Sequence, residues 1–144
     1  MNFPRILKKR KGYIDRIKPF MQKSVAKVLT GQRRVGKSFL LYQLIEEILA
    51  EEPDANIIYV EDFTFSSLQT AEDLHSYIIS HSKEKVKNYI FIDEIQDIPG
   101  FEKVIRSLLL NEDNDIYITG SNAKMLSGEL ATYLSGRYIE FKIY

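Results

Sequence analysis

Several residue types that carry common protein chemistries are absent or rare in this sequence. There is no cysteine among the 144 residues, which excludes disulfide bridges and thiolate metal sites. Histidine occurs only twice, at His75 and His81, too few for a histidine metal cluster. No apolar run approaches the roughly 20 residues of a membrane span, and the charged N-terminus lacks the apolar segment of a signal peptide. We therefore expect a cytoplasmic protein with no membrane partner.

Charge is balanced overall but unevenly distributed along the chain. Residues 1–38 hold 12 Lys and Arg and one acidic residue, whereas residues 39–144 hold eight basic and 19 acidic residues. A polyphosphate ligand would account for part of the basic excess, but not for the cluster between Arg5 and Lys11. That cluster is either a solvated tail or a contact for nucleic acid or an acidic partner. We treat residues 1–22 as a basic N-terminal lead-in.

Short apolar runs alternate with helical patterns over the rest of the chain. The residues predict strands at 24–30, 56–61, 89–92, 116–119 and 138–144, and helices at 37–51, 70–86, 101–110 and 122–134. Residues 13–21 fit a short helix or an extended lead-in broken at Pro19. Three of the strands are continuous apolar runs, typical of a parallel sheet covered on both faces. The length favours one domain, which we place at residues 23–144 as an α/β fold.

A glycine-containing loop joins the first strand to the first helix. It reads Gly31-Gln32-Arg33-Arg34-Val35-Gly36-Lys37-Ser38. This is G-x-x-x-x-G-K-S between a strand and a helix, the phosphate-binding loop of P-loop NTPases. The backbone N–H groups of such a loop form an anion nest at the helix N-terminus. Lys37 would contact the β- and γ-phosphates, and the Ser38 hydroxyl would be a ligand of Mg²⁺.

Two carboxylates follow the apolar strand at residues 89–92. Acidic residues often end strands, but this strand is expected beside the phosphate-loop strand, so its end reaches the same crevice. Asp93 would then hold Mg²⁺, directly or through a water, because hard cations prefer oxygen ligands. Glu94 would be the general base that polarises the attacking water. Gln96 either contacts water or starts a loop.

Polar residues also flank the last two predicted strands. Thr119, Ser121 and Asn122 either face the γ-phosphate and orient water, or belong to a glycine turn in which Ser121 or Asn122 is a helix N-cap. The sequence does not distinguish which of them would contact phosphate. Arg137 precedes the fifth strand, which we expect to place it at the rim of the nucleotide crevice. There it either reaches the phosphate of a neighbouring subunit, implying self-association, or makes a contact within its own chain.

Three segments resemble one branch of prokaryotic AAA-type ATPases, in which a P-loop domain precedes a C-terminal domain of unknown function. They are TGQRRVGKS at 30–38, FIDEIQ at 91–96 and IYITGSNAKMLSGELATYLSGRY at 116–138. The resemblance implies a three-layer fold with a parallel five-stranded sheet in the order 5-1-4-3-2. It also implies ATP with Mg²⁺, and Lys37, Ser38, Asp93 and Glu94 as site residues. Nothing here corresponds to the C-terminal domain, so we expect a domain truncated at its C-terminus.

These observations favour an ATP-hydrolysing module that couples energy or acts as a switch within a larger protein. The alternative is a nucleotide-dependent switch with negligible turnover that binds protein or nucleic acid. Glu94 argues against this, since a pure binder needs no general base. A P-loop kinase is disfavoured by the Asp-Glu pair and by the lack of an evident arginine-rich lid.

Overall fold

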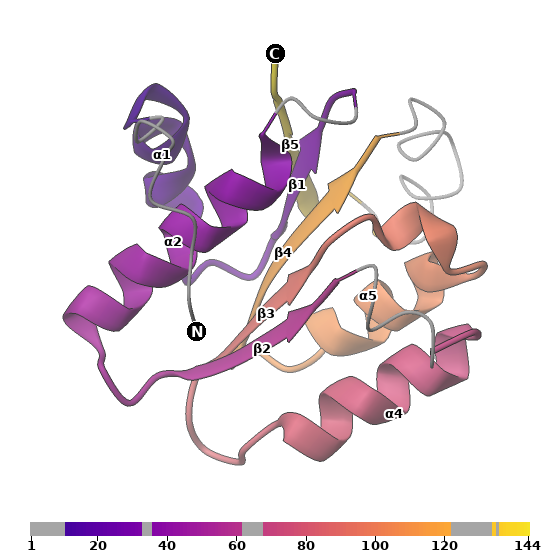
Figure 1. Cartoon of the computed structure of the whole chain (residues 1–144). Helices are drawn as coiled ribbons and strands as arrows, with labels where there is room; N and C mark the ends of the chain where they lie inside the picture. The colour runs from indigo at the N-terminus through magenta and orange to yellow at the C-terminus, as the bar shows by residue number, and fades with distance from the viewer. Residues whose placement is uncertain (1–10, 33–35, 62–67, 122–133, 135) are drawn as a thin grey trace.

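Parallel strands form the centre of the molecule. The computed structural model describes residues 11–32, 36–61, 68–121, 134 and 136–144. Its five-stranded sheet has the order β2-β3-β4-β1-β5, and all neighbours are parallel (Figure 1). In chain order the strands are β1 (Ala26–Thr30), β2 (Asn56–Val60), β3 (Asn88–Ile92), β4 (Asn114–Gly120) and β5 (Tyr138–Lys142). This is the predicted order 5-1-4-3-2 read from the other edge, so the expected fold class is confirmed.

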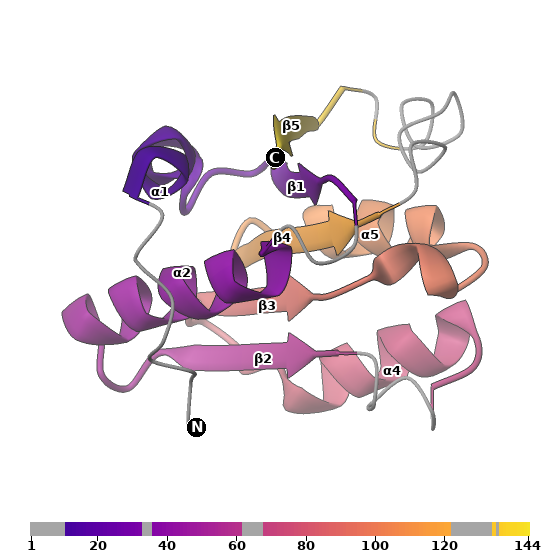
Figure 2. The same ribbon diagram turned by 45° about the horizontal axis from the view of Figure 1, so that its top comes forward.

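Helices cover both faces of this sheet. They are α1 (Lys11–Ile17), η1 (Lys18–Phe20), α2 (Lys37–Glu51), α4 (Ala71–His81), η2 (Ile95–Asp97) and α5 (Phe101–Leu109). Figure 2 shows α1 and α2 on one face and α4 and α5 on the other. Each face has its own buried apolar cluster, as expected for strands that are apolar on both sides. None of the described helices combines the length and apolar character needed to cross a lipid bilayer.

The predicted helix at 70–86 is correct at its start but too long. Thr70 accepts a hydrogen bond from the Asp73 N–H, and the Asp73 carboxylate accepts one from the Thr70 N–H, forming a capping box. The helix ends at His81. Beyond it, the buried Asn88 side chain bonds both the N–H and the carbonyl of Lys83, which holds this segment in a non-helical turn. The helix predicted at 122–134 lies outside the described residues except for Leu134.

Strand register determines which residues share an edge of the sheet. Leu29 of β1 is opposite Thr119 of β4, and Ile92 of β3 is opposite Ile118 of β4. The strand expected directly beside the phosphate-loop strand, β3, is instead separated from β1 by β4. The carboxyl ends of β1, β3 and β4 nevertheless meet at one edge. This edge carries the start of the glycine loop, the Asp-Glu pair and the polar residues after β4.

Candidate active site

The glycine loop leads directly into α2. Gly36 has a φ of 92°, a left-handed conformation that glycine adopts without strain, and α2 begins at Lys37. The Lys37 side chain is buried and folds back over the loop. Its ammonium group donates to the carbonyl oxygens of Gly31, at 2.6 Å, and Gln32, at 2.8 Å. Arg33, Arg34 and Val35 lie outside the described residues, so their part in phosphate binding stays a prediction.

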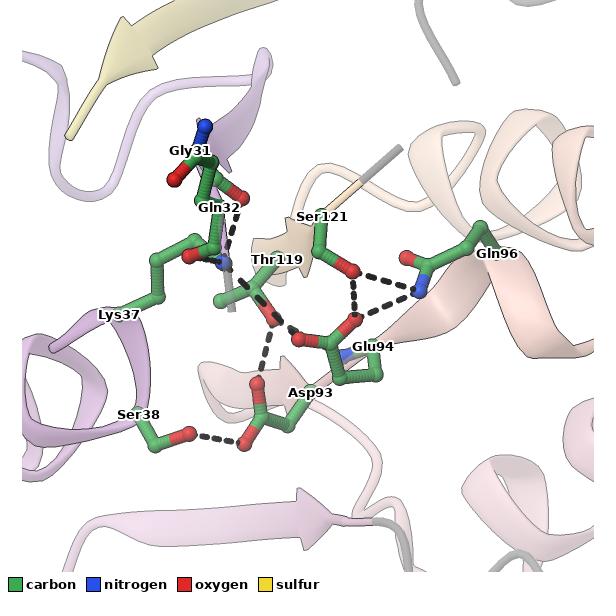
Figure 3. A network of polar contacts seen from close by, with 9 residues as sticks. All are labelled: Gly31, Gln32, Lys37, Ser38, Asp93, Glu94, Gln96, Thr119 and Ser121. Atoms are coloured by element: carbon green, nitrogen blue, oxygen red, sulfur yellow. Dashed lines mark hydrogen bonds and ion pairs between the residues drawn. The ribbon is translucent and has the colours of Figure 1, made fainter. Parts of the chain in front are cut away.

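Asp93 links α2 to the sheet at the end of β3. Only 6% of its surface is exposed. One carboxylate oxygen accepts from the Ser38 hydroxyl at 2.5 Å, and the other accepts from the Thr119 hydroxyl (Figure 3). The fold thus brings together the two residues expected to bind the metal, although they are 55 positions apart.

The donor set at this point fits Mg²⁺. A hydroxyl and a carboxylate are hard oxygen ligands, which suit this cation. No cluster of three or more His, Cys, Asp or Glu side chains occurs among the described residues. Mg²⁺ typically keeps several waters and shares substrate phosphates, so one hydroxyl and one carboxylate can serve as its protein ligands.

Thr119 connects the two acidic residues. Its hydroxyl donates to Asp93 and accepts from the backbone N–H of Glu94 at 2.8 Å. The Thr119 side chain is fully buried. The sequence predicted Thr119 only as one of three residues that either face phosphate or form a turn. In the structure it instead fixes the backbone and carboxylate at the end of β3.

We expect Thr119→Val to destabilise the fold by about 1–3 kcal/mol, because it leaves a buried carboxylate oxygen and a buried N–H without partners. Valine has nearly the same shape, so the loss isolates the hydroxyl. Urea unfolding would measure it. Thr30→Val, at the corresponding end of the neighbouring β1, serves as a comparison because the Thr30 hydroxyl bonds Glu140 rather than the Asp-Glu pair. A loss below about 0.5 kcal/mol for Thr119→Val would contradict the bridging role.

Glu94 adopts a left-handed backbone conformation, with a φ of 54°. Its carboxylate lies between Lys37 and two polar side chains, Gln96 and Ser121 (Figure 3). Oε2 accepts from Gln96 Nε2 at 2.5 Å and from the Ser121 hydroxyl at 2.9 Å. Oε1 lies 4.0 Å from the Lys37 ammonium nitrogen. The proposed base therefore faces the lysine expected to hold the phosphates.

Most of the predicted site residues meet at this edge of the sheet. They are Gly31, Gln32, Gly36, Lys37, Ser38, Asp93, Glu94 and Ser121. Asn122 lies outside the described residues. Gln96, considered only as a water contact or loop residue, contacts Glu94 directly. The available signal was its position two residues after Glu94 in the segment FIDEIQ.

Arg137 lies elsewhere, and its expected position at the rim of the crevice was wrong. It precedes β5, and because Ala26 is opposite Tyr138 in parallel register, it lies at the amino edge of the sheet. Its guanidinium donates to the carbonyl oxygen of Leu109 at 2.8 Å, at the end of α5. The error concerns strand direction, because the site lies at the carboxyl ends of the strands whereas Arg137 precedes the amino end of β5. The contact within the chain is thus present, and a role toward a neighbouring subunit stays a prediction.

Curated proteins from two organisms are similar to this chain. An uncharacterized protein of Haemophilus influenzae is 42% identical over 144 residues, covering 94% of this chain and 35% of the relative. An uncharacterized protein of Methanocaldococcus jannaschii is 36% identical over 120 residues, covering 81% of this chain and 26% of the relative. The chain therefore spans about a third or less of the length of these relatives.

Solved structures share the fold at low sequence identity. Cdc6p from Pyrobaculum aerophilum aligns with a TM-score of 0.65 and 13% identity, covering 97% of this chain and 47% of that chain. The Aeropyrum pernix ORC1 protein, solved in complex with DNA, aligns with a TM-score of 0.65 and 14% identity, covering 98% and 46%. At these identities the likeness concerns the fold.

The family is given by a sequence model of the AAA domain, which matches residues 23–144. This match covers the glycine loop, the Asp-Glu pair and all five strands. The matched range is also the one predicted for the P-loop domain. The chain belongs to the AAA domain family and contains its P-loop ATPase module.

Proposed function

We propose that this chain binds ATP with Mg²⁺ and hydrolyses ATP to ADP and phosphate, as an energy-coupling or switch module of a larger protein. The observation that carries the proposal is the convergence of Lys37, the Ser38–Asp93 pair and Glu94 at one edge of the sheet. Each supplies one requirement of phosphoryl transfer to water: phosphate binding, a metal site and a general base.

The loop at residues 31–38, with Lys37, would bind the phosphates. The start of α2 offers backbone N–H groups and the positive end of a helix dipole, which favour an anion. The Lys37 ammonium donates to two carbonyl oxygens of the loop, which supports a role for it in phosphate binding. Ser38 and Asp93 would hold Mg²⁺, which when bound neutralises charge on the phosphate oxygens.

Glu94 performs the proton transfer. A water donates its proton to the carboxylate, its oxygen forms a bond to the γ-phosphorus, and the bond from that phosphorus to the bridging oxygen breaks. ADP leaves with the electron pair of that bond. General-base assistance of this kind typically accelerates a reaction by about 10²–10⁴-fold. The position of Glu94 opposite Lys37 supports this role, because the base and the phosphate-binding cation face the same space.

A test of nucleotide binding centres on Lys37. At ATP concentrations a hundredfold above Kd, ligand binding should stabilise the parent chain by about 2.7 kcal/mol. We expect Lys37→Ala to lose most of this increment, because the cation that contacts the phosphates is removed. Thermal or urea unfolding with and without ATP and Mg²⁺ would measure it. Lys103→Ala, at an exposed position of α5, is the matched control and should keep the full increment. A parent chain that shows no nucleotide-dependent stabilisation would contradict the proposal.

A nucleotide-dependent switch with negligible turnover is the second candidate. The excess of basic residues within positions 1–38 favours nucleic acid or an acidic protein as its partner. This candidate is separated from the first by one measurement, since a switch binds ATP but releases no phosphate. The cellular process that the protein serves, its partners and a C-terminal domain of the full-length protein are likewise proposals.

A further inference from the structure

Gln96 contacts the proposed base through its side-chain amide. It lies in η2, two positions after Glu94. Its Nε2 atom is 2.5 Å from Glu94 Oε2 and 3.3 Å from the Ser121 hydroxyl oxygen. A carboxylate oxygen only accepts hydrogen bonds, so the amide nitrogen, and not the amide oxygen, must face Glu94. The contact therefore has a defined direction.

The two oxygens of the Glu94 carboxylate are consequently not equivalent. Oε2 receives hydrogen bonds from both Gln96 and Ser121. Oε1 is turned toward Lys37, at 4.0 Å from its ammonium nitrogen. Figure 3 shows Gln96 and Ser121 on one side of the carboxylate and Lys37 on the other. Two donors on one oxygen restrict rotation of the carboxylate, which keeps Oε1 directed at the phosphate-binding side.

Two features of this arrangement are unfavourable for the stability of the fold. The Gln96 amide oxygen is buried and has no hydrogen-bond partner in the described part of the chain. Glu94 has a positive φ of 54°, which is rarely adopted by residues other than glycine. Orphaned buried acceptors and strained backbones are uncommon and concentrate at functional sites. A glutamine required only for packing would not need to leave its oxygen unpaired.

We propose that Gln96 is a positioning residue that, together with Ser121, holds Glu94 so that Oε1 is the atom that accepts the proton from water. This inference rests on the proposed function, since it specifies how the base of that reaction is oriented. The proton passes from water to Oε1, while Oε2 keeps its two hydrogen bonds. Gln96 itself contacts neither water nor nucleotide in this scheme.

Two substitutions separate hydrogen bonding from shape. Gln96→Met keeps the length of the side chain but removes the donor. Gln96→Glu keeps its shape but replaces the donor with an acceptor. We expect kcat to fall about ten- to a hundredfold for Gln96→Met, as for the loss of a hydrogen bond to a charged group. The fall should be larger for Gln96→Glu, and the Kd for ATP should stay within about twofold for both.

Asp97→Asn is the matched control, because it changes an exposed side chain in the same turn and should leave kcat unchanged. A role in packing alone predicts the opposite order, with the isosteric Gln96→Glu close to the parent chain. A parent chain that turns over while both Gln96 variants retain its kcat would overturn the inference. A parent chain that binds ATP but never hydrolyses it would instead contradict the proposed function.

A double-mutant cycle tests the contact between Gln96 and Glu94 from stability alone, with no measurement of activity. The unfolding free energies of Glu94→Ala, Gln96→Ala and the double variant would be measured in urea. Because the two side chains share a hydrogen bond, we expect the double variant to lose clearly less than the two single losses added together. Additive losses would show that Gln96 does not hold the carboxylate.

Discussion

Replacing Glu94 with glutamine should leave ATP binding intact and slow hydrolysis by about 10²–10⁴-fold, the usual contribution of a general base. The amide oxygen of the new residue can still accept hydrogen bonds from Gln96 and Ser121 at the position of Oε2. Its amide nitrogen would then face Lys37 in place of Oε1 and cannot accept a proton. The substitution therefore removes the chemistry and preserves the shape.

Phosphate release and nucleotide-dependent stabilisation, measured on the same preparation, would check this expectation. Glu102→Gln is a suitable control, since it makes the same chemical change in the first turn of α5. It should behave like the parent chain in both measurements. Equal turnover in the parent chain and in Glu94→Gln would remove Glu94 from the reaction.

The second large effect concerns an ion pair buried at the opposite edge of the sheet. Lys27 and Asp115 have fully buried side chains, and the ammonium donates to the carboxylate at 2.5 Å. The other carboxylate oxygen accepts from the Gln22 N–H at 3.0 Å and from the Tyr117 hydroxyl at 2.7 Å. We expect Asp115→Asn to lower the free energy of unfolding by about 3–5 kcal/mol, because it leaves a buried charge without its partner.

Urea unfolding at several pH values would test this prediction. Burial lowers the pKa of Lys27 below its usual 10.5, while Asp115 opposes this shift. Without Asp115, the unfolded chain binds more protons at Lys27 than the folded chain does. Stability of the variant should therefore rise with pH toward 10.5, and the deficit should shrink.

The matched control is the double variant Lys27→Met with Asp115→Asn, which removes both charges. It should be more stable than Asp115→Asn alone, because no unpaired charge is buried. A single variant that loses less than about 1 kcal/mol would indicate that water or another group replaces the carboxylate.

Local sequence patterns determined much of this protein. The bounds of α2 at Lys37–Glu51 and the capping box at Thr70 follow from apolar periodicity and capping chemistry. These signals are contained within a few consecutive residues, so they can be read without the fold. The phosphate loop and the Asp-Glu pair were recognisable for the same reason, and the resemblance supplied the strand order.

Only the tertiary structure decided how distant side chains pair. Thr119 bridges Asp93 and Glu94, Ser121 donates to Glu94, and Lys27 pairs with Asp115 from a position 88 residues away. Each contact depends on strand order and register, which bring together residues that no local pattern relates. The position of Arg137 also depended on tertiary structure. The sequence placed Arg137 before a strand, but only the direction of that strand within the sheet decided which edge of the sheet Arg137 occupies.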